Sequence, residues 1–207
     1  MTLANKKEIV RKIHQQSKEL TKRMWKNLKP YINSEIKLLK KINPKKYENF
    51  SRKDWSNYIR RKLGPEWCAL IDKKYNLVSP RYGFTGEDVL FPKPVRCVSP
   101  KPYSIGDVHY HPVYKKYPSV DDLMSWTNRY LFGERIFCIH TDYSTICYFF
   151  SDKIKKEEIP KELFSIGLAL FGCPRSIRKK IHEWFEYMLN KKRIKVIEIK
   201  GGEKWQE

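Results

Sequence analysis

The sequence predicts an α/β (α+β) fold in which a mixed β-sheet is flanked by helices. Short apolar and aromatic runs of strand length occupy the middle of the chain, whereas apolar residues at helical spacing prevail towards both ends. Hydrophobic residues make up 41% and aromatic residues 14% of the 207 residues, which is enough for a packed core. The length is sufficient for one domain with an extension.

The first part of the chain is predicted to be helical and basic. The first helix is expected over residues 4–29 and to end at Pro30, and a second over residues 34–42. Ser51 is a suitable N-cap for a third helix that reaches Leu63. The apolar residues that recur at helical spacing in the first helix are Ile9, Ile13, Leu20, Met24, Trp25 and Leu28.

Strand-like runs follow, and two further helices come after them. The predicted strands are residues 67–71, 76–78, 89–98, 105–111, 135–140 and 145–150. The last two runs are separated by Thr141-Asp142-Tyr143-Ser144, which predicts a hairpin in the centre of the sheet. His140 lies at its turn, and we expect it not to be a metal ligand. Helices are expected over residues 160–171 and 174–192, and residues 194–199 alternate like a half-exposed strand.

The cysteines indicate a reducing environment. They form no C-x-x-C pair and their number is odd, so neither a disulfide framework nor a cysteine-based zinc finger is expected. Most lie in apolar strand-like runs, where cysteine behaves as a small buried hydrophobe, and a cytoplasmic (intracellular) setting fits best. Residues 1–16 lack the apolar segment of a secretory signal, and no apolar run is long enough to cross a membrane. The cysteines are Cys68, Cys97, Cys138, Cys147 and Cys173.

The positive charge is concentrated near the N-terminus. The formal net charge is +20, and residues 1–63 hold 19 Lys or Arg against 5 Asp or Glu, a net charge of +14. A region this basic is attracted to polyanions at low salt. Nucleic acid or another polyanion is therefore a candidate partner of residues 1–63, although a merely solvated helical face accounts for the same charge.

One motif carries most of the chemical information. His109 and His111 precede a proline, and Ser119 and Asp122 follow, in the pattern H-x-H-P-x6-S-x-x-D. Strand side chains alternate between faces, so the two imidazoles point the same way. Residues 119–131 have helical spacing, which puts Ser119 and Asp122 in one first turn. A strand end that faces a helix start can bring all four groups together.

These residue types match an open zinc site. Catalytic zinc usually takes three protein ligands, and His109, His111 and Asp122 supply them, which predicts one Zn²⁺ per chain. Taken alone, Ser119 and Asp122 form a helix capping box, and a lone strand histidine is more often a packed residue. The combination of all four residues at this spacing favours a metal site.

The pattern resembles that of the JAMM (MPN-plus, JAB/Mov34-type) zinc metalloproteases, over about residues 51–151. The resemblance implies a JAMM-like sheet core, the three ligands above, Ser119 as an oxyanion donor and an upstream glutamate as general base. Glu66 matches that glutamate best, because Pro65-Glu66-Trp67-Cys68-Ala69 resembles the family's upstream segment, with Ala69 where glycine is usual. Glu87 is the competing candidate.

The resemblance also implies a reaction and a division of the chain. The reaction would be zinc-dependent hydrolysis of a peptide or isopeptide bond at the C-terminus of ubiquitin or a ubiquitin-like or sulfur-carrier protein, as in a deubiquitinase. Residues 1–50 would form a basic helical extension, 51–151 the hydrolase core and 152–207 a helical extension ending in a short strand. The alternative is a JAMM-like nucleic-acid-associated binding or scaffold module that uses the basic helices.

Overall fold

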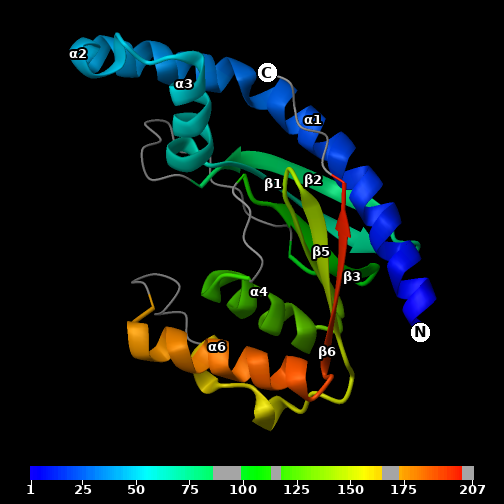
Figure 1. Cartoon of the computed structure of the whole chain (residues 1–207). Helices are drawn as coiled ribbons and strands as arrows, with labels where there is room; N and C mark the ends of the chain where they lie inside the picture. The colour runs from blue at the N-terminus through cyan, green and yellow to red at the C-terminus, as the bar shows by residue number, and fades with distance from the viewer. Residues whose placement is uncertain (86–98, 113–117, 165–172, 202–207) are drawn as a thin grey trace.

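The computed structural model of the chain contains one six-stranded mixed sheet between helices, which confirms the predicted α/β class (Figure 1). The structure describes residues 1–85, 99–112, 118–164 and 173–201. The sheet has the order β2-β1-β3-β4-β5-β6, and every neighbouring pair is antiparallel except the parallel pair β3–β4. The strands are β1 (Pro65–Asp72), β2 (Leu77–Phe84), β3 (Ser104–Tyr110), β4 (Ile136–His140), β5 (Ser144–Phe150) and β6 (Ile194–Lys200).

The described helices agree with the predicted ones over most of their length. They are α1 (Leu3–Ile42), α2 (Pro44–Tyr47), α3 (Arg52–Tyr58), α4 (Val120–Leu131) and α6 (Arg175–Asn190), with short turns η1 (Ile59–Leu63), η2 (Lys156–Glu158) and η3 (Lys161–Phe164). The predicted strand 89–98 lies outside the described residues, as does most of the predicted helix 160–171. Among the described helices, none combines the length and the apolar character needed to cross a membrane.

The two faces of the sheet support separate cores. On one face, Trp67, Val108 and Tyr110 pack with the apolar stripe of α1. On the other face, Phe137 and Tyr148 pack with α4 and α6 (Figure 1). Strand residues two positions apart share a face, so adjacent positions on β3 serve different cores.

Helix α1 passes through Pro30 without ending, so the prediction that Pro30 ends the first helix is wrong. The predicted helix 34–42 is the last part of α1. Leu28 and Ile32 are buried on either side of Pro30, while Pro30 itself is exposed. A proline inside a helix costs about 3 kcal/mol, whereas each fully buried large apolar side chain contributes roughly 1.5–3 kcal/mol. The free energy gained by burying this continuous row of apolar side chains therefore exceeds the cost of the proline.

Both ends of the described chain take part in the central structure. Val10 and Ile13 of α1 are fully buried in the core between α1 and the sheet. At the other end of the chain, β6 pairs with β5 along its whole length. The strand that the alternation at residues 194–199 predicts is thus present. The three-part division of the chain stays a prediction, and within the structure α1 and β6 share cores with the strands between them.

The crossover from β3 through α4 to β4 determines where polar side chains gather. Because β3 and β4 are parallel, α4 returns the chain to the edge where β3 began and itself starts beside the end of β3. The two strands approach so closely at Gly106 that a Cβ there would lie 1.6 Å from the carbonyl oxygen of Ile136. Only glycine fits this position, which lies near the start of both strands.

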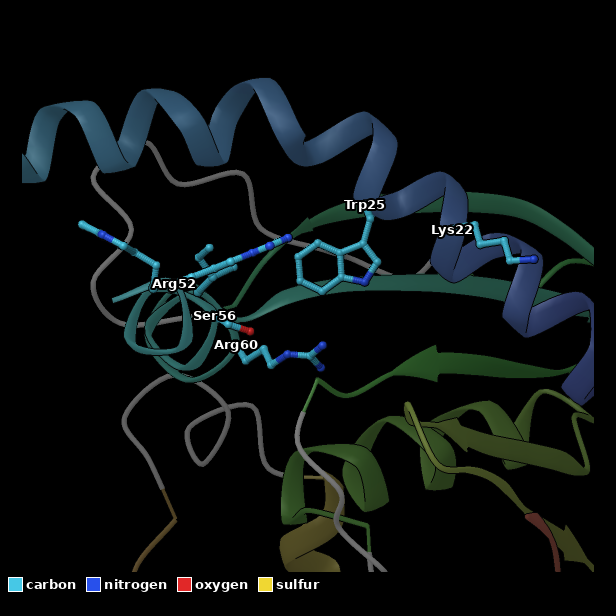
Figure 2. A pocket seen from close by; sticks show the side chains of 7 residues that line it. Lys22, Trp25, Arg52, Ser56 and Arg60 are labelled. Atoms are coloured by element: carbon cyan, nitrogen blue, oxygen red, sulfur yellow. The ribbon is translucent and has the colours of Figure 1, made fainter. Parts of the chain in front are cut away.

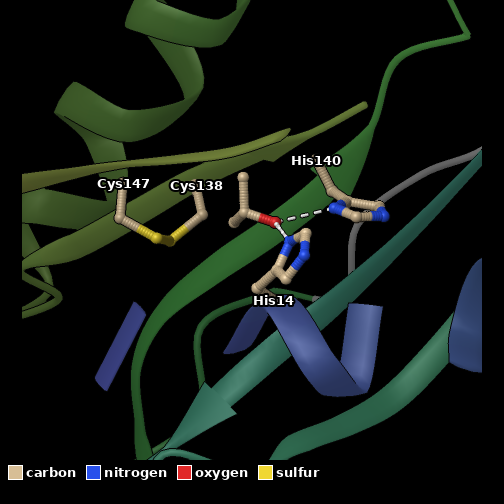
Figure 3. Close-up of a disulfide and its surroundings, with 5 residues drawn as sticks. His14, Cys138, His140 and Cys147 are labelled. Carbon is tan, nitrogen blue, oxygen red and sulfur yellow. Dashed lines mark hydrogen bonds between the residues drawn. A yellow bond between two sulfur atoms is a disulfide. The ribbon is translucent and has the colours of Figure 1, made fainter. Parts of the chain in front are cut away.

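A disulfide joins Cys138 of β4 to Cys147 of β5 (Figure 3), so the expectation that the cysteines form no disulfide framework is wrong. The predicted hairpin is present, and its register places the two cysteines directly opposite each other with a Cα–Cα distance of 4.1 Å. Cys68 is disulfide-bonded as well, and Cys173 is free. Disulfides are rare in cytosolic proteins, so the inference of a reducing, cytoplasmic setting loses its support.

Candidate metal centre

His109, His111 and Asp122 meet where β3 ends and α4 begins. One potential ligand atom from each of the three side chains lies within 4.8 Å of the others, and the group could hold a metal ion. Nε2 of His109 is 3.0 Å and Nε2 of His111 is 3.8 Å from Oδ1 of Asp122. The side chains are 12–13% exposed, so solvent reaches a site that is otherwise enclosed.

The first turn of α4 orients the Asp122 carboxylate. The backbone N–H of Ser119 donates to Oδ2 of Asp122 at 2.6 Å, and the backbone N–H of Asp122 donates to Oγ of Ser119 at 3.1 Å. This is a complete capping box. Because Oδ2 is held by the helix, Oδ1 is the oxygen that faces the imidazoles. The capping role and the ligand role are therefore compatible in the same two residues.

The charges at the site favour a cation between these groups. Burial opposes a positive charge on His109, but Asp122, and to a smaller extent Asp107 and Glu66, raise the pKa of that imidazole to about 9. Burial likewise opposes a charge on Asp122, yet the two histidines and Ser119 hold its pKa well below the usual range. Nε2 of His109 is buried and makes no aligned hydrogen bond despite the nearby carboxylate. Such an atom suits a metal ligand, whose binding would displace the proton.

Glu66 lies beside this cluster. Cys68 of β1 pairs with His109 of β3 in antiparallel register, and Glu66 is two residues before Cys68, on the same face of β1. Glu66 is half-buried, and its charge contributes to the raised pKa of His109. It is not one of the three grouped ligands. The competing candidate, Glu87, lies outside the described residues.

A buried ion-pair network beneath the site was not predicted. Asp107 is 1% exposed, and its Oδ2 accepts from Nε of Arg129 at 2.9 Å. Nη1 of Arg129 donates to Oε2 of Glu134 at 2.8 Å, and Glu134 also accepts from the hydroxyl of Ser104. Burial is the main cause that raises the pKa of Asp107 to about 6. Asp107 is two residues before His109, and Arg129 is two helical turns after Asp122, so the network joins the same two elements as the ligands.

His140 belongs to the opposite face of the sheet. Its partner in β3 is Tyr110, so it points towards α1, away from His109. Oγ1 of Thr145 lies 2.7 Å from Nδ1 of His140 and 2.9 Å from Nδ1 of His14 (Figure 3). Nε2 of His14 is 3.1 Å from the carbonyl of Gly201, which can only accept. In neutral His14, Nε2 therefore carries the proton and donates to Gly201, and Nδ1 accepts a hydrogen bond from the Thr145 hydroxyl. The oxygen of the same hydroxyl accepts the Nδ1–H of His140.

We expect the buried His140 to make the protein less stable in acid. Burial lowers its pKa to about 3, so in the folded protein it stays neutral, whereas in the unfolded chain it gains a proton near pH 6.5. Stability is therefore lost as pH falls from about 6.5 towards 3, by about 2 kcal/mol between pH 7 and pH 5. Urea unfolding of the wild type and His140→Gln at both pH values measures this. Equal losses in the two proteins would contradict the assignment.

The chain was compared with protein-family models, with curated proteins and with solved structures, and none of them matches.

Proposed function

We propose that the chain is a zinc-dependent hydrolase of peptide or isopeptide bonds, with His109, His111 and Asp122 as the metal ligands. The observation that carries the proposal is the convergence of these three side chains to within 4.8 Å at a solvent-accessible point. Two imidazoles and one carboxylate are a donor set typical of catalytic zinc. A zinc ion there supplies Lewis acidity to a water nucleophile and to the scissile carbonyl.

Two neighbouring side chains have roles that follow from their positions. The charge of Glu66 acts on His109, and its carboxylate would take the proton of an attacking water and return it to the leaving amine. The oxygen of the Ser119 hydroxyl accepts the backbone N–H of Asp122, which leaves its O–H to donate to the developing oxyanion. The ubiquitin-like or sulfur-carrier substrate is supported by the resemblance of the motif to the JAMM metalloproteases.

Elemental analysis is the direct test of the metal centre. We expect about one zinc ion per chain in the purified wild type and its loss in Asp122→Asn and His109→Ala, because each variant removes one of three ligands. Asp121→Asn is the matched control: Asp121 is exposed in the same helical turn and lies outside the ligand group. A folded wild-type protein that takes up no zinc after reconstitution would overturn the proposal.

A second candidate function is a nucleic-acid-associated binding or scaffold module. The observation that favours it is the distribution of charge on α1, where the cations are exposed and the apolar residues face the sheet. This function predicts salt-sensitive binding to nucleic acid that Asp122→Asn does not change. The exposed cations of α1 include Lys7, Arg11, Arg23, Lys26 and Lys29.

A further inference from the structure

A cavity of about 410 Å³ lies between α1 and α3, and no metal-centre residue lines it (Figure 2). Figure 2 shows the indole of Trp25 projecting from α1 into the space towards the helical turns that carry Ser56 and Arg60. The lining residues are Lys22, Trp25, Arg52, Trp55, Ser56, Ile59 and Arg60. Aromatic surface and cationic side chains are thus combined in one cavity of the size that small-molecule sites have.

Contacts on both sides hold the cavity walls in place. Trp55 stacks on Tyr47 with ring centroids 5.5 Å apart, and Phe50 and Tyr58 pack around the same pair. Arg60 forms an ion pair with Asp142, whose other oxygen accepts the hydroxyl of Tyr110 at 2.7 Å. The aromatic contacts hold α3 against α2, and the ion pair joins η1 to the turn between β4 and β5, so the walls are held in place without a ligand. Because the walls are already ordered, binding of a ligand does not cost the entropy of ordering them.

The chemistry of the lining selects for a flat, negatively charged molecule. Arg60 already lies over the ring of Trp25, 5.7 Å from its centroid, which leaves the Trp25 indole partly covered by a cation. Arg52 is exposed at the cavity, and no carboxylate is among the lining residues. Lys22, which also lines the cavity, pairs with Glu19 of the same helix at 3.3 Å. An aliphatic ligand would desolvate these cations without compensation. A ligand with an aromatic ring and an attached anion can stack on the indole with its ring and pair with the cations through its anion.

We propose that this cavity binds a nucleobase that carries a phosphate. The base stacks in the space lined by Trp25 and Trp55, and the phosphate lies against Arg52. The same chemistry is present in a free nucleotide and in one nucleotide of a single-stranded nucleic acid. The site is independent of the metal centre, so the proposal does not depend on the proposed hydrolase activity.

The experiment titrates the full chain with defined probes. Calorimetry with adenosine monophosphate, adenosine and inorganic phosphate tests whether base and phosphate are both needed, and fluorescence anisotropy with a labelled twelve-nucleotide DNA strand tests the polymer. We expect the nucleotide or the strand to bind, with weaker binding at higher salt. Binding of adenosine monophosphate identifies a free nucleotide as sufficient, whereas binding of the strand alone identifies the polymer as the source.

Matched variants locate the binding. Trp25→Leu is expected to weaken binding by roughly tenfold or more, because stacking of one base contributes on that scale. Arg52→Gln is expected to weaken it, whereas Lys53→Gln, which removes the same charge from the next exposed residue of α3 outside the cavity, is not. Equal effects of the Arg52 and Lys53 variants, or no binding at low salt, would overturn the proposal. Asp122→Asn should bind like the wild type, which separates this result from that of the metal centre.

Discussion

Glu66→Gln is expected to lower the rate of peptide-bond hydrolysis by roughly 10²- to 10⁴-fold without changing the zinc content. The amide is close in shape to the carboxylate but cannot take a proton from the attacking water. Glu66 lies outside the grouped ligands, so the metal should remain bound. The measurement is kcat for cleavage of a fusion in which a reporter follows the C-terminus of a ubiquitin-like protein, together with elemental analysis of the same samples.

Glu87→Gln is the matched comparison, since it removes the same charge from the competing candidate. We expect it to keep most of the activity, because Glu66 is close enough to His109 for its charge to raise the pKa of that imidazole. Asp122→Asn should lose zinc and activity together, which distinguishes a ligand from a base. Loss of activity in the Glu87 variant but not in the Glu66 variant would assign the base to Glu87 instead.

Arg129→Met is expected to destabilise the protein by about 3–5 kcal/mol. The change leaves Asp107 and Glu134 buried, each 1% exposed, without the guanidinium that pairs with both. The loss should be smaller at pH 5 than at pH 8. The pKa of Asp107 is already raised to about 6, so its carboxyl group is mostly neutral at pH 5 and needs no counter-charge. Urea unfolding at the two pH values measures both effects.

Arg11→Met provides the control for Arg129→Met. Arg11 pairs with Glu8 on the surface of α1, with side chains 62% and 74% exposed, and such pairs contribute at most about 1 kcal/mol. A loss below 1 kcal/mol in the Arg129 variant would show that the network does not hold α4 against β3. The prediction concerns stability alone.

The sequence predicted those features of the structure that are determined by residues close to one another along the chain. The alternation of β3 gives a shared face to His109 and His111, and the helical spacing after Ser119 puts Asp122 one turn from the cap. Both periodicities are local, so the proximity of these groups could be predicted without the fold. The same holds for the hairpin of β4 and β5, whose apolar runs flank a short polar turn.

The features that the sequence did not reveal depend on the exact register of a hairpin or on packing between elements distant in sequence. Cys138 and Cys147 are opposed only because of the hairpin register, which their spacing does not determine. Pro30 lies inside a helix because the apolar residues before and after it, such as Leu28 and Ile32, are buried in the core that α1 shares with the sheet. Arg129 is paired with Asp107 across two elements, and on a helix read alone it resembles a surface residue. In each case tertiary packing outweighs the local signal.

The crossover that carries the metal ligands also bears on how the site forms. His109 and Asp122 belong to one β3–α4 unit, so the ligands come together by closing a single short stretch of chain. Closing a short loop costs little entropy, whereas pairing β1 with β3 and β5 with β6 requires contacts between residues far apart in sequence. A metal ion at this site would therefore stabilise the centre of the sheet early, and the ion would favour folding of the chain as well as the chemistry of the finished site.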